Sequence, residues 1–363
     1  PPKGMAAGPC VEGICEYTLG NGLRVLLFPD ASKPTVTVNI AYGVGSVHEN
    51  YGETGMAHLL EHMLFKGTPT HGDIPGEMKK RGIEKNASTW TDRTNYFGSF
   101  PANDDTLDWM LGLEADRMVH SFIAKKDLDS EMTVVRNEME DGENSPFGVL
   151  SERVYSTAYL WHNYGHDTIG ARSDVENVPI ERLQAFYRTW YRPDNATLIV
   201  AGKIDPQKTL GTIQKYYGAI ARPTTTMPKF YTVEPVQDGE REVNVRRSGD
   251  VRVLNASYHI PGKTHPDIAA LQVLVTLLSD QASGRLHKAL VETKIASGAS
   301  AGYYGFRDSS LASFVLSAPK DGDIAKAEAE LLRIAEGFAA SPLTDEEVNN
   351  AKQRIANNYE RTF

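Results

Sequence analysis

Two histidines and one glutamate stand close together in the stretch His58-Leu-Leu-Glu61-His62. Positions i, i+3 and i+4 of an α-helix share one face, so a helix here turns both imidazoles and the carboxylate to the same side. Imidazoles are common ligands of catalytic zinc, which takes three protein ligands and keeps a fourth position for water. A nearby carboxylate can accept the proton of that water, and Glu61 is placed for this role. The alternative is a helix with two surface histidines of no function.

The residues around this motif have the pattern of a buried helix, which favours the metal site over the alternative. Five apolar residues form a stripe at helical spacing: Met56, Leu59, Leu60, Met63 and Leu64. A stripe of this kind packs into a core and fixes the direction of the polar face. Thr54 is the expected N-cap, and Gly67 followed by Pro69 is the expected end of the helix.

The order His-x-x-Glu-His is the signature of the inverzincins. The longer stretch GMAHLLEHMLFKGTP resembles the pitrilysin/insulinase family of zinc metallopeptidases, which includes the mitochondrial processing peptidase. In this family the third zinc ligand is a glutamate in a later V-x-N-E helix, which the chain matches at Glu138. A supporting glutamate precedes that ligand, and the matching residue is Glu131. A solvated helix charge is the alternative for Glu131.

The resemblance implies one Zn²⁺ per chain and a defined set of site residues. Positions 131, 135 and 138 share one helical stripe, so both glutamates can face the metal. Glu61 is the general base that takes a proton from zinc-bound water and returns it to the leaving amine. The implied metal ligands are His58, His62 and Glu138, and the implied catalytic residues are Glu61 and Glu131.

A threonine- and aromatic-rich segment, 86–97, is expected to contain strand. In the resembled family the matching strand lies at the edge of the sheet beside the zinc, and substrate backbone adds to it as a further strand. The resemblance therefore implies that Asn86 and Ala87 bind substrate main chain. An ordinary edge strand without this role is the alternative.

The composition is that of a globular protein. The chain has 363 residues, 40% of them hydrophobic and 23% charged, and a net charge of −9. The negative charge argues against nucleic acid as a partner, and no apolar run approaches the length of a membrane span. The length exceeds that of a single usual core, so two domains are expected.

A Pro-, Thr- and polar-rich stretch at 222–240 is the expected linker between two domains, 1–221 with the zinc and 241–363 without it. The pattern restarts after the linker, since 251–258 alternates like 36–42, and Ile268 to Leu278 takes the place of the metal helix. The second copy lacks His-x-x-Glu-His, as in a diverged internal repeat. The resemblance implies an α+β fold of two similar domains, each an antiparallel β-sheet with helices packed on one face.

The second domain departs from the family pattern. Many relatives carry an arginine and a tyrosine there that bind substrate, but the matching positions here are Val291 and Gly298. The resemblance therefore implies a partner, fused or separate, that supplies the Arg/Tyr pair. A family half normally continues further, so the second domain is expected to be truncated.

The resemblance implies a zinc metalloendopeptidase that hydrolyses unfolded peptides or small proteins inside a clam-like chamber. The alternative is a non-catalytic family subunit that serves as a structural or peptide-binding partner. The N-terminus has no starting methionine, so an upstream segment is expected to have been removed. Cys10 and Cys15 form a disulfide or stay thiols, and their spacing does not decide. A bacterial periplasmic location is expected, with a cytoplasmic or organellar one as the alternative.

Overall fold

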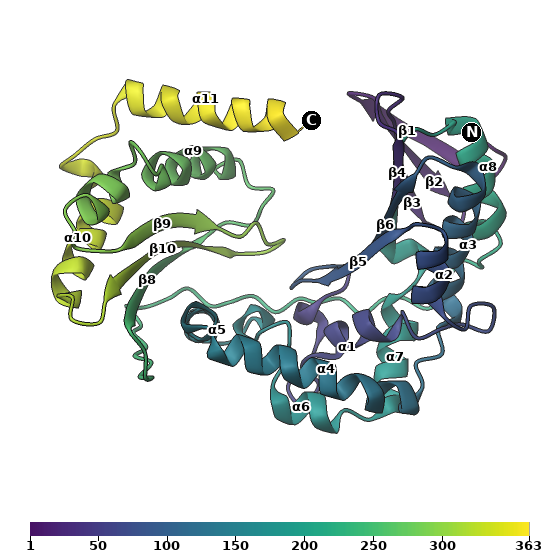
Figure 1. Cartoon of the computed structure of the whole chain (residues 1–363), viewed down its shortest axis with the longest axis horizontal. Helices are drawn as coiled ribbons and strands as arrows, with labels where there is room; N and C mark the ends of the chain where they lie inside the picture. The colour runs from purple at the N-terminus through teal and green to yellow at the C-terminus, as the bar shows by residue number, and fades with distance from the viewer. Residues whose placement is uncertain (363) are drawn as a thin grey trace. The chain divides into compact units, whose positions relative to one another are not determined.

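The computed structural model describes residues 1–362 and divides into two compact units (Figure 1). The first comprises Pro1–Asp141 and Trp161–Val233, and the second comprises Gly142–Leu160 and the chain from Glu234 onward. Both units combine helices with antiparallel strands, so the predicted α+β class is confirmed. None of the helices in residues 1–362 combines the length and hydrophobicity of a membrane span.

The first unit is built on a seven-stranded sheet with the order β1-β2-β3-β7-β4-β6-β5, in which only β3 and β7 pair in parallel. Its strands are β1 Met5–Val11, β2 Ile14–Leu19, β3 Arg24–Pro29, β4 Thr35–Tyr42, β5 Glu84–Thr89, β6 Thr94–Pro101 and β7 Ala196–Gly202. Its helices are α1 Met56–Met63, α2 Ile74–Lys80, α3 Asp104–His120, α4 Lys125–Asn144, α6 Arg172–Asn177, α7 Ile180–Trp190 and α8 Pro206–Tyr217, and the end of α4 falls in the second unit.

Alternation along the central strands directs one face of this sheet into the core. In β4, Val36, Val38 and Ile40 are fully buried, whereas the residues between them are half-buried. The buried face joins the apolar side of α1 and of α3 in one core, which includes Leu60 and Leu111. Because side chains alternate in a strand and recur every three to four residues in a helix, both patterns were readable from the sequence.

β1 and β2 form an antiparallel hairpin, and the sequence of β1 gives little sign of a strand. β1 contains Gly8 and Pro9 and is mostly exposed, so it lacks the apolar alternation that identifies a strand. Its pairing with β2 includes a disulfide between Cys10 and Cys15, which lie opposite each other. The structure thus selects the disulfide from the two alternatives for these cysteines.

The second unit is built on a three-stranded antiparallel sheet with the order β8-β10-β9. Its strands are β8 Val251–Ile260, β9 Gly298–Tyr303 and β10 Ser310–Pro319. Its helices are α5 Pro146–Ala158, α9 Ile268–Ser279, the short π-helix η4 His287–Val291, α10 Ile324–Glu336 and α11 Asp345–Thr362. The short 3₁₀ turns of the two units are η1 Ser46–His48, η2 Asn163–Gly165, η3 Pro193–Asn195 and η5 Gly337–Ala339.

The two units repeat one arrangement of strands, as the sequence predicted. In the first unit, β4 is followed by α1, β5 and β6, and these strands pair in the order β4-β6-β5. In the second unit, β8 is followed by α9, β9 and β10, which pair in the equivalent order β8-β10-β9. The strand, helix, edge strand and middle strand therefore recur in sequence and in topology. α9 occupies the position of α1 but carries no histidine.

The unit boundary between Val233 and Glu234 falls inside the expected linker 222–240. Residues 221–250 contain no helix or strand. The segment Gly142–Leu160, placed in the first domain by sequence, packs with the second unit through α5, where the Tyr159 hydroxyl donates to the Ser309 carbonyl at 2.9 Å. The division into domains 1–221 and 241–363 stays a prediction.

A bidentate ion pair joins two distant parts of the second unit. Arg285 donates from Nε and Nη2 to the two carboxylate oxygens of Glu347 at 2.7 Å each. Its guanidinium also donates to the carbonyls of Ser341 and Pro342 at 2.7 and 2.8 Å. Paired, parallel hydrogen bonds of this kind fix geometry more firmly than a single contact. Arg285 therefore ties the segment before η4 to the start of α11.

We expect this pair to make stability depend on pH. The hydrogen bonds from Arg285 lower the pKa of Glu347 from 4.5 to about 2. A carboxyl group with a lowered folded-state pKa stabilises the fold above its unfolded pKa, and the contribution is lost as pH falls from 4.5 towards 2. Glu347→Gln should therefore lower the thermal midpoint at pH 7, and its deficit relative to the unmodified chain should shrink below pH 4.5. Glu346→Gln at the exposed neighbouring position is the control, and a deficit that is constant with pH would contradict the prediction.

Candidate metal centre

Helix α1 begins with a glycine in an unusual backbone conformation. Gly55 is the N-cap and has a φ of 92°, in the left-handed region that favours glycine. A Cβ at this position would lie 2.6 Å from a side-chain carbon of Val175. The prediction that Thr54 caps the helix was wrong, because its hydroxyl donates to Asp174 at 2.8 Å and its amide donates to the same oxygen.

A buried carboxylate performs the capping that was expected of Thr54. Glu49 is fully buried, and its two oxygens accept from the backbone amides of Gly55 and Ala57 at 2.8 Å each. Burial raises the pKa of Glu49 to about 8, although these two hydrogen bonds act in the opposite direction. The sequence analysis missed this residue, since a glutamate in a loop six residues before the N-cap gives no recognisable capping pattern. Glu49 thus fixes the first turn of α1, which leads directly into His58.

Three donor atoms from α1 and α4 converge within the first unit. Nε2 of His58 lies 3.3 Å from Nε2 of His62, and Oε2 of Glu138 lies 3.5 Å from both nitrogens. The sequence placed two of these residues on one helix turn, and the structure brings the third from a helix far along the chain. Both imidazoles are only 16% exposed, whereas the Glu138 side chain is 42% exposed.

These separations fit a zinc ion. Four ligands held tetrahedrally at about 2.0–2.2 Å lie roughly 3.3–3.6 Å from one another. The three distances between the donor atoms fall in this range. Burial, and secondly the neighbouring His62, lower the pKa of His58 to about 4, so His58 stays neutral as a metal ligand must. The Nδ1 atom of His58 is buried and has no hydrogen-bond partner within residues 1–362.

Glu131 contacts the outer nitrogen of His62. Its Oε2 lies 3.1 Å from Nδ1 of His62, and its other oxygen, Oε1, is paired with Lys66. Burial alone would raise the pKa of Glu131, but hydrogen bonds from Lys66 and His62 outweigh it, so the pKa is lowered. Since a carboxylate only accepts hydrogen bonds, Nδ1 of His62 carries the hydrogen and Nε2 offers its lone pair. Glu131 therefore contacts a histidine of the donor set, and its supporting role stays a prediction.

Glu61 lies on the same helix and contacts the edge strand β5. The Thr89 hydroxyl donates to its Oε2 at 2.5 Å. Burial raises the pKa of Glu61, and the Thr89 hydrogen bond partly opposes this effect. A raised pKa lies closer to neutral pH, and a general base works best when its pKa is near the pH of the reaction. Thr89 is a further residue that sequence analysis missed, because its contact depends on how a strand lies against α1.

β5 forms a free edge of the seven-stranded sheet, next to α1. The Trp90 amide donates to the Arg93 carbonyl at 2.7 Å, and hydrogen-bonded pairs alternate along an antiparallel ladder. Given the register of Asn86 with Phe97, the Ala87 amide and carbonyl point away from β6. Consistently, the Ala87 amide donates to the side chain of Asn86 at 2.9 Å. These two residues thus lie at an edge of the sheet described by residues 1–362, and their predicted role in substrate binding stays a prediction.

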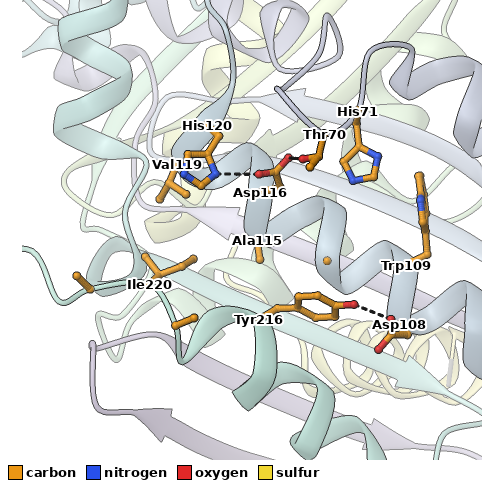
Figure 2. Close-up of a pocket in the computed structure, with 13 residues that line it drawn as sticks. Thr70, His71, Asp108, Trp109, Ala115, Asp116, Val119, His120, Tyr216 and Ile220 are labelled. Carbon is orange, nitrogen blue, oxygen red and sulfur yellow. Dashed lines mark hydrogen bonds and ion pairs between the residues drawn. The ribbon is translucent and has the colours of Figure 1, made fainter.

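A cavity of about 810 Å³ lies elsewhere in the first unit (Figure 2). Several of its polar side chains are paired with one another. Asp116 accepts from His120 at 2.8 Å and from Thr70, and Asp108 accepts from Tyr216 at 2.6 Å. None of the predicted site residues lines it, so this cavity is no candidate for the metal chemistry. The lining residues are Thr70, His71, Asp108, Trp109, Gly112, Ala115, Asp116, Val119, His120, Tyr216, Ala219, Ile220 and Ala221.

Comparison with known proteins relates the chain to zinc proteases. Zinc protease PqqE of Helicobacter pylori is 31% identical over 342 residues, which cover 92% of this chain and 77% of that protein. A probable mitochondrial-processing peptidase subunit beta of Arabidopsis thaliana is 28% identical over 265 residues, which cover 72% of this chain and 49% of that protein. The chain therefore spans about half the length of the plant relative.

The fold has a close counterpart among solved structures. The crystal structure of a protease from Helicobacter pylori superposes with a TM-score of 0.91 at 29% identity, covering 96% of this chain and 85% of that one. The Insulinase (Peptidase family M16) profile matches residues 24–172, which include all three donor residues. The profile described as Peptidase M16 inactive domain matches residues 177–355. The chain belongs to the pitrilysin/insulinase family of zinc metallopeptidases, peptidase family M16.

Proposed function

We propose that the chain is the zinc-bearing part of a metalloendopeptidase that hydrolyses unfolded peptides or small proteins. The observation that carries the proposal is the convergence of the His58, His62 and Glu138 donor atoms at 3.3–3.5 Å, beside a glutamate that is none of the three. A structural zinc site typically has four protein ligands and no open position. Three donors with an adjacent carboxylate support catalysis instead.

The proposed roles follow from the contacts of each side chain. His58, His62 and Glu138 would hold Zn²⁺, which when bound supplies a Lewis acid that polarises a carbonyl and acidifies water. Glu61 accepts the proton of the attacking water and returns it to the leaving amine. Thr89 orients the Glu61 carboxylate through its hydroxyl. Glu131 orients the His62 ring through Nδ1.

The free edge of β5 is the proposed binding site for substrate main chain. An extended peptide that pairs with the outward amide and carbonyl of Ala87 would run beside α1, since Thr89 of the same strand contacts Glu61. The Asn86 side chain, which accepts from the Ala87 amide, would turn outward to hydrogen-bond the peptide. Pairing through main chain does not depend on side-chain identity, so this site fits many unfolded peptides.

Ala87→Pro tests this edge directly. Proline removes an amide hydrogen that points away from β6, and proline is tolerated at such positions of edge strands. Losing one hydrogen bond, worth about 0.5–1.5 kcal/mol, should lower kcat/KM roughly three- to tenfold, through KM rather than kcat. Ala87→Ser, which keeps the amide, should cleave peptides like the unmodified chain. Equal KM values for the proline and serine variants would argue against substrate pairing at Ala87.

The proposal includes a second family half, either fused to this chain or a separate subunit, that carries the missing Arg/Tyr pair. The two halves together would enclose the substrate. The experiment is cleavage of a quenched fluorescent peptide by the chain alone and mixed with a family member that has this pair. We expect weak cleavage that the second half increases, that a chelator abolishes and that added zinc restores. Cleavage that the second half does not raise would refute the need for a partner. Absence of cleavage in the mixture would favour the non-catalytic subunit.

We keep the periplasm as the proposed location. The Cys10–Cys15 disulfide supports it, because disulfides persist in oxidising compartments such as the bacterial periplasm and are rare in the cytosol. Non-reducing mass spectrometry of the chain purified from its native cells would test the pairing. Free thiols on both cysteines would favour the cytoplasmic alternative.

A further inference from the structure

We propose that Lys66 is a positioning residue for the metal centre and acts on His62 through Glu131. This inference rests on the proposed zinc site and assigns a role to a residue outside the donor set. Lys66 pairs with Oε1 of Glu131, while Oε2 of the same carboxylate lies 3.1 Å from Nδ1 of His62. The three side chains form a chain of contacts from the end of α1 to α4 and back to α1.

The two contacts on one carboxylate decide its orientation. The terminal torsion angle of a glutamate side chain takes a broad range of values. One hydrogen bond therefore leaves the carboxylate plane free to rotate. Lys66 and His62 occupy different oxygens of Glu131, and together they fix that plane. A fixed acceptor in turn fixes the His62 ring, with the hydrogen on Nδ1 and the lone pair on Nε2, the atom that lies 3.5 Å from Oε2 of Glu138.

Burial separates this contact from an ordinary surface ion pair, which contributes little. The side chains of Glu131 and His62 are 14% and 16% exposed, and that of Lys66 is 27% exposed. Lys66 lies close to Glu131 because a tight turn follows α1. In this turn the Lys66 amide donates to the Met63 carbonyl at 3.0 Å. This turn places Lys66 four residues after His62, and both side chains contact the same carboxylate.

The test compares Lys66→Met, Lys66→Arg and Glu131→Gln in the full chain. Zinc affinity, measured by competition with a chromophoric chelator, should fall about 10-fold or more in Lys66→Met, as expected when an outer partner of a metal-bound histidine is lost. Lys66→Arg should retain most of the affinity, because it keeps a cationic donor. Lys80→Met, at an exposed position of α2, is the matched control and should not change it.

A double variant separates positioning from general stability. In a Glu131→Gln background, Lys66→Met should produce no further loss of affinity, since the lysine acts through that carboxylate. In the metal-free chain, ¹⁵N NMR should show His62 as the Nδ1–H tautomer, and Lys66→Met should make the tautomers mix. Unchanged affinity in Lys66→Met, or an equal loss in both backgrounds, would overturn the proposal. A chain that shows the lysine effect on zinc but cleaves no peptide even with the second family half present would refute the proposed peptidase alone. A chain that binds no zinc would refute both proposals.

Discussion

Glu61→Gln should abolish most peptide cleavage and leave zinc binding intact. A carboxamide cannot accept the proton that the attacking water must lose, and general base catalysis is worth about 10²–10⁴-fold in rate. The three converging donor atoms belong to other residues, so the substitution removes no ligand. The measurement is kcat for a quenched fluorescent peptide, with the second family half present, beside zinc content by elemental analysis.

The control for this variant is Glu84→Gln, which makes the same chemical change at an exposed position of β5. It should keep both the zinc and the activity. If Glu61→Gln cleaved peptide as fast as the unmodified chain, Glu61 would have no part in the mechanism. If it lost zinc together with activity, Glu61 would be a ligand and the donor set would need revision.

Glu138→Gln should remove most of the bound zinc. Its carboxylate oxygen lies 3.5 Å from Nε2 of both histidines, and a neutral carboxamide is a much poorer ligand for zinc. Loss of a residue that hydrogen-bonds a metal ligand lowers metal affinity about 10- to 100-fold. Loss of a ligand itself should cost more, so we expect the zinc affinity to fall by more than about 100-fold. About one zinc per unmodified chain and almost none in the variant is the expected result of elemental analysis.

Glu140→Gln is the matched control for the third ligand. Glu140 lies on the same helix, is exposed, and is absent from the converging group of donors. Its substitution should leave the zinc content unchanged. Zinc retained by Glu138→Gln would leave the two histidines as ligands and reject Glu138 as the third. Zinc absent from the unmodified chain as well would favour the non-catalytic subunit.

Local spacing was enough to identify the helix and its polar face. His58, Glu61 and His62 are separated by three and four residues, and helical geometry alone turns them to one side. Alternation was likewise enough for β4, whose buried and half-buried residues follow one another. These features depend on neighbours in sequence, so no knowledge of the fold was required.

Capping and outer contacts were decided by tertiary structure. The sequence indicated Thr54 as the cap of α1, but the amides of the first turn bind the buried carboxylate of Glu49 instead. Thr89 contacts Glu61 from a position that carries no motif. Lys66 lies in the stretch that resembles the family, but neither its type nor its spacing indicated its contact with Glu131. Their contacts arise from how loops and strands pack around α1. Many different sequences can produce such packing, so no single sequence pattern identifies these residues.

The sequence by itself determined the pair of histidines, the glutamate between them and the two-copy plan of the chain, because each follows from a short repeat period or a recognisable motif. Only the tertiary structure decided that the Glu138 carboxylate meets both imidazoles, that β5 is a free edge beside Glu61, and that Lys66 and Glu131 form one chain of contacts with His62. These facts join residues that lie far apart in sequence. Their distances are set by the packing of α4 and β5 against α1, which local periodicity does not encode.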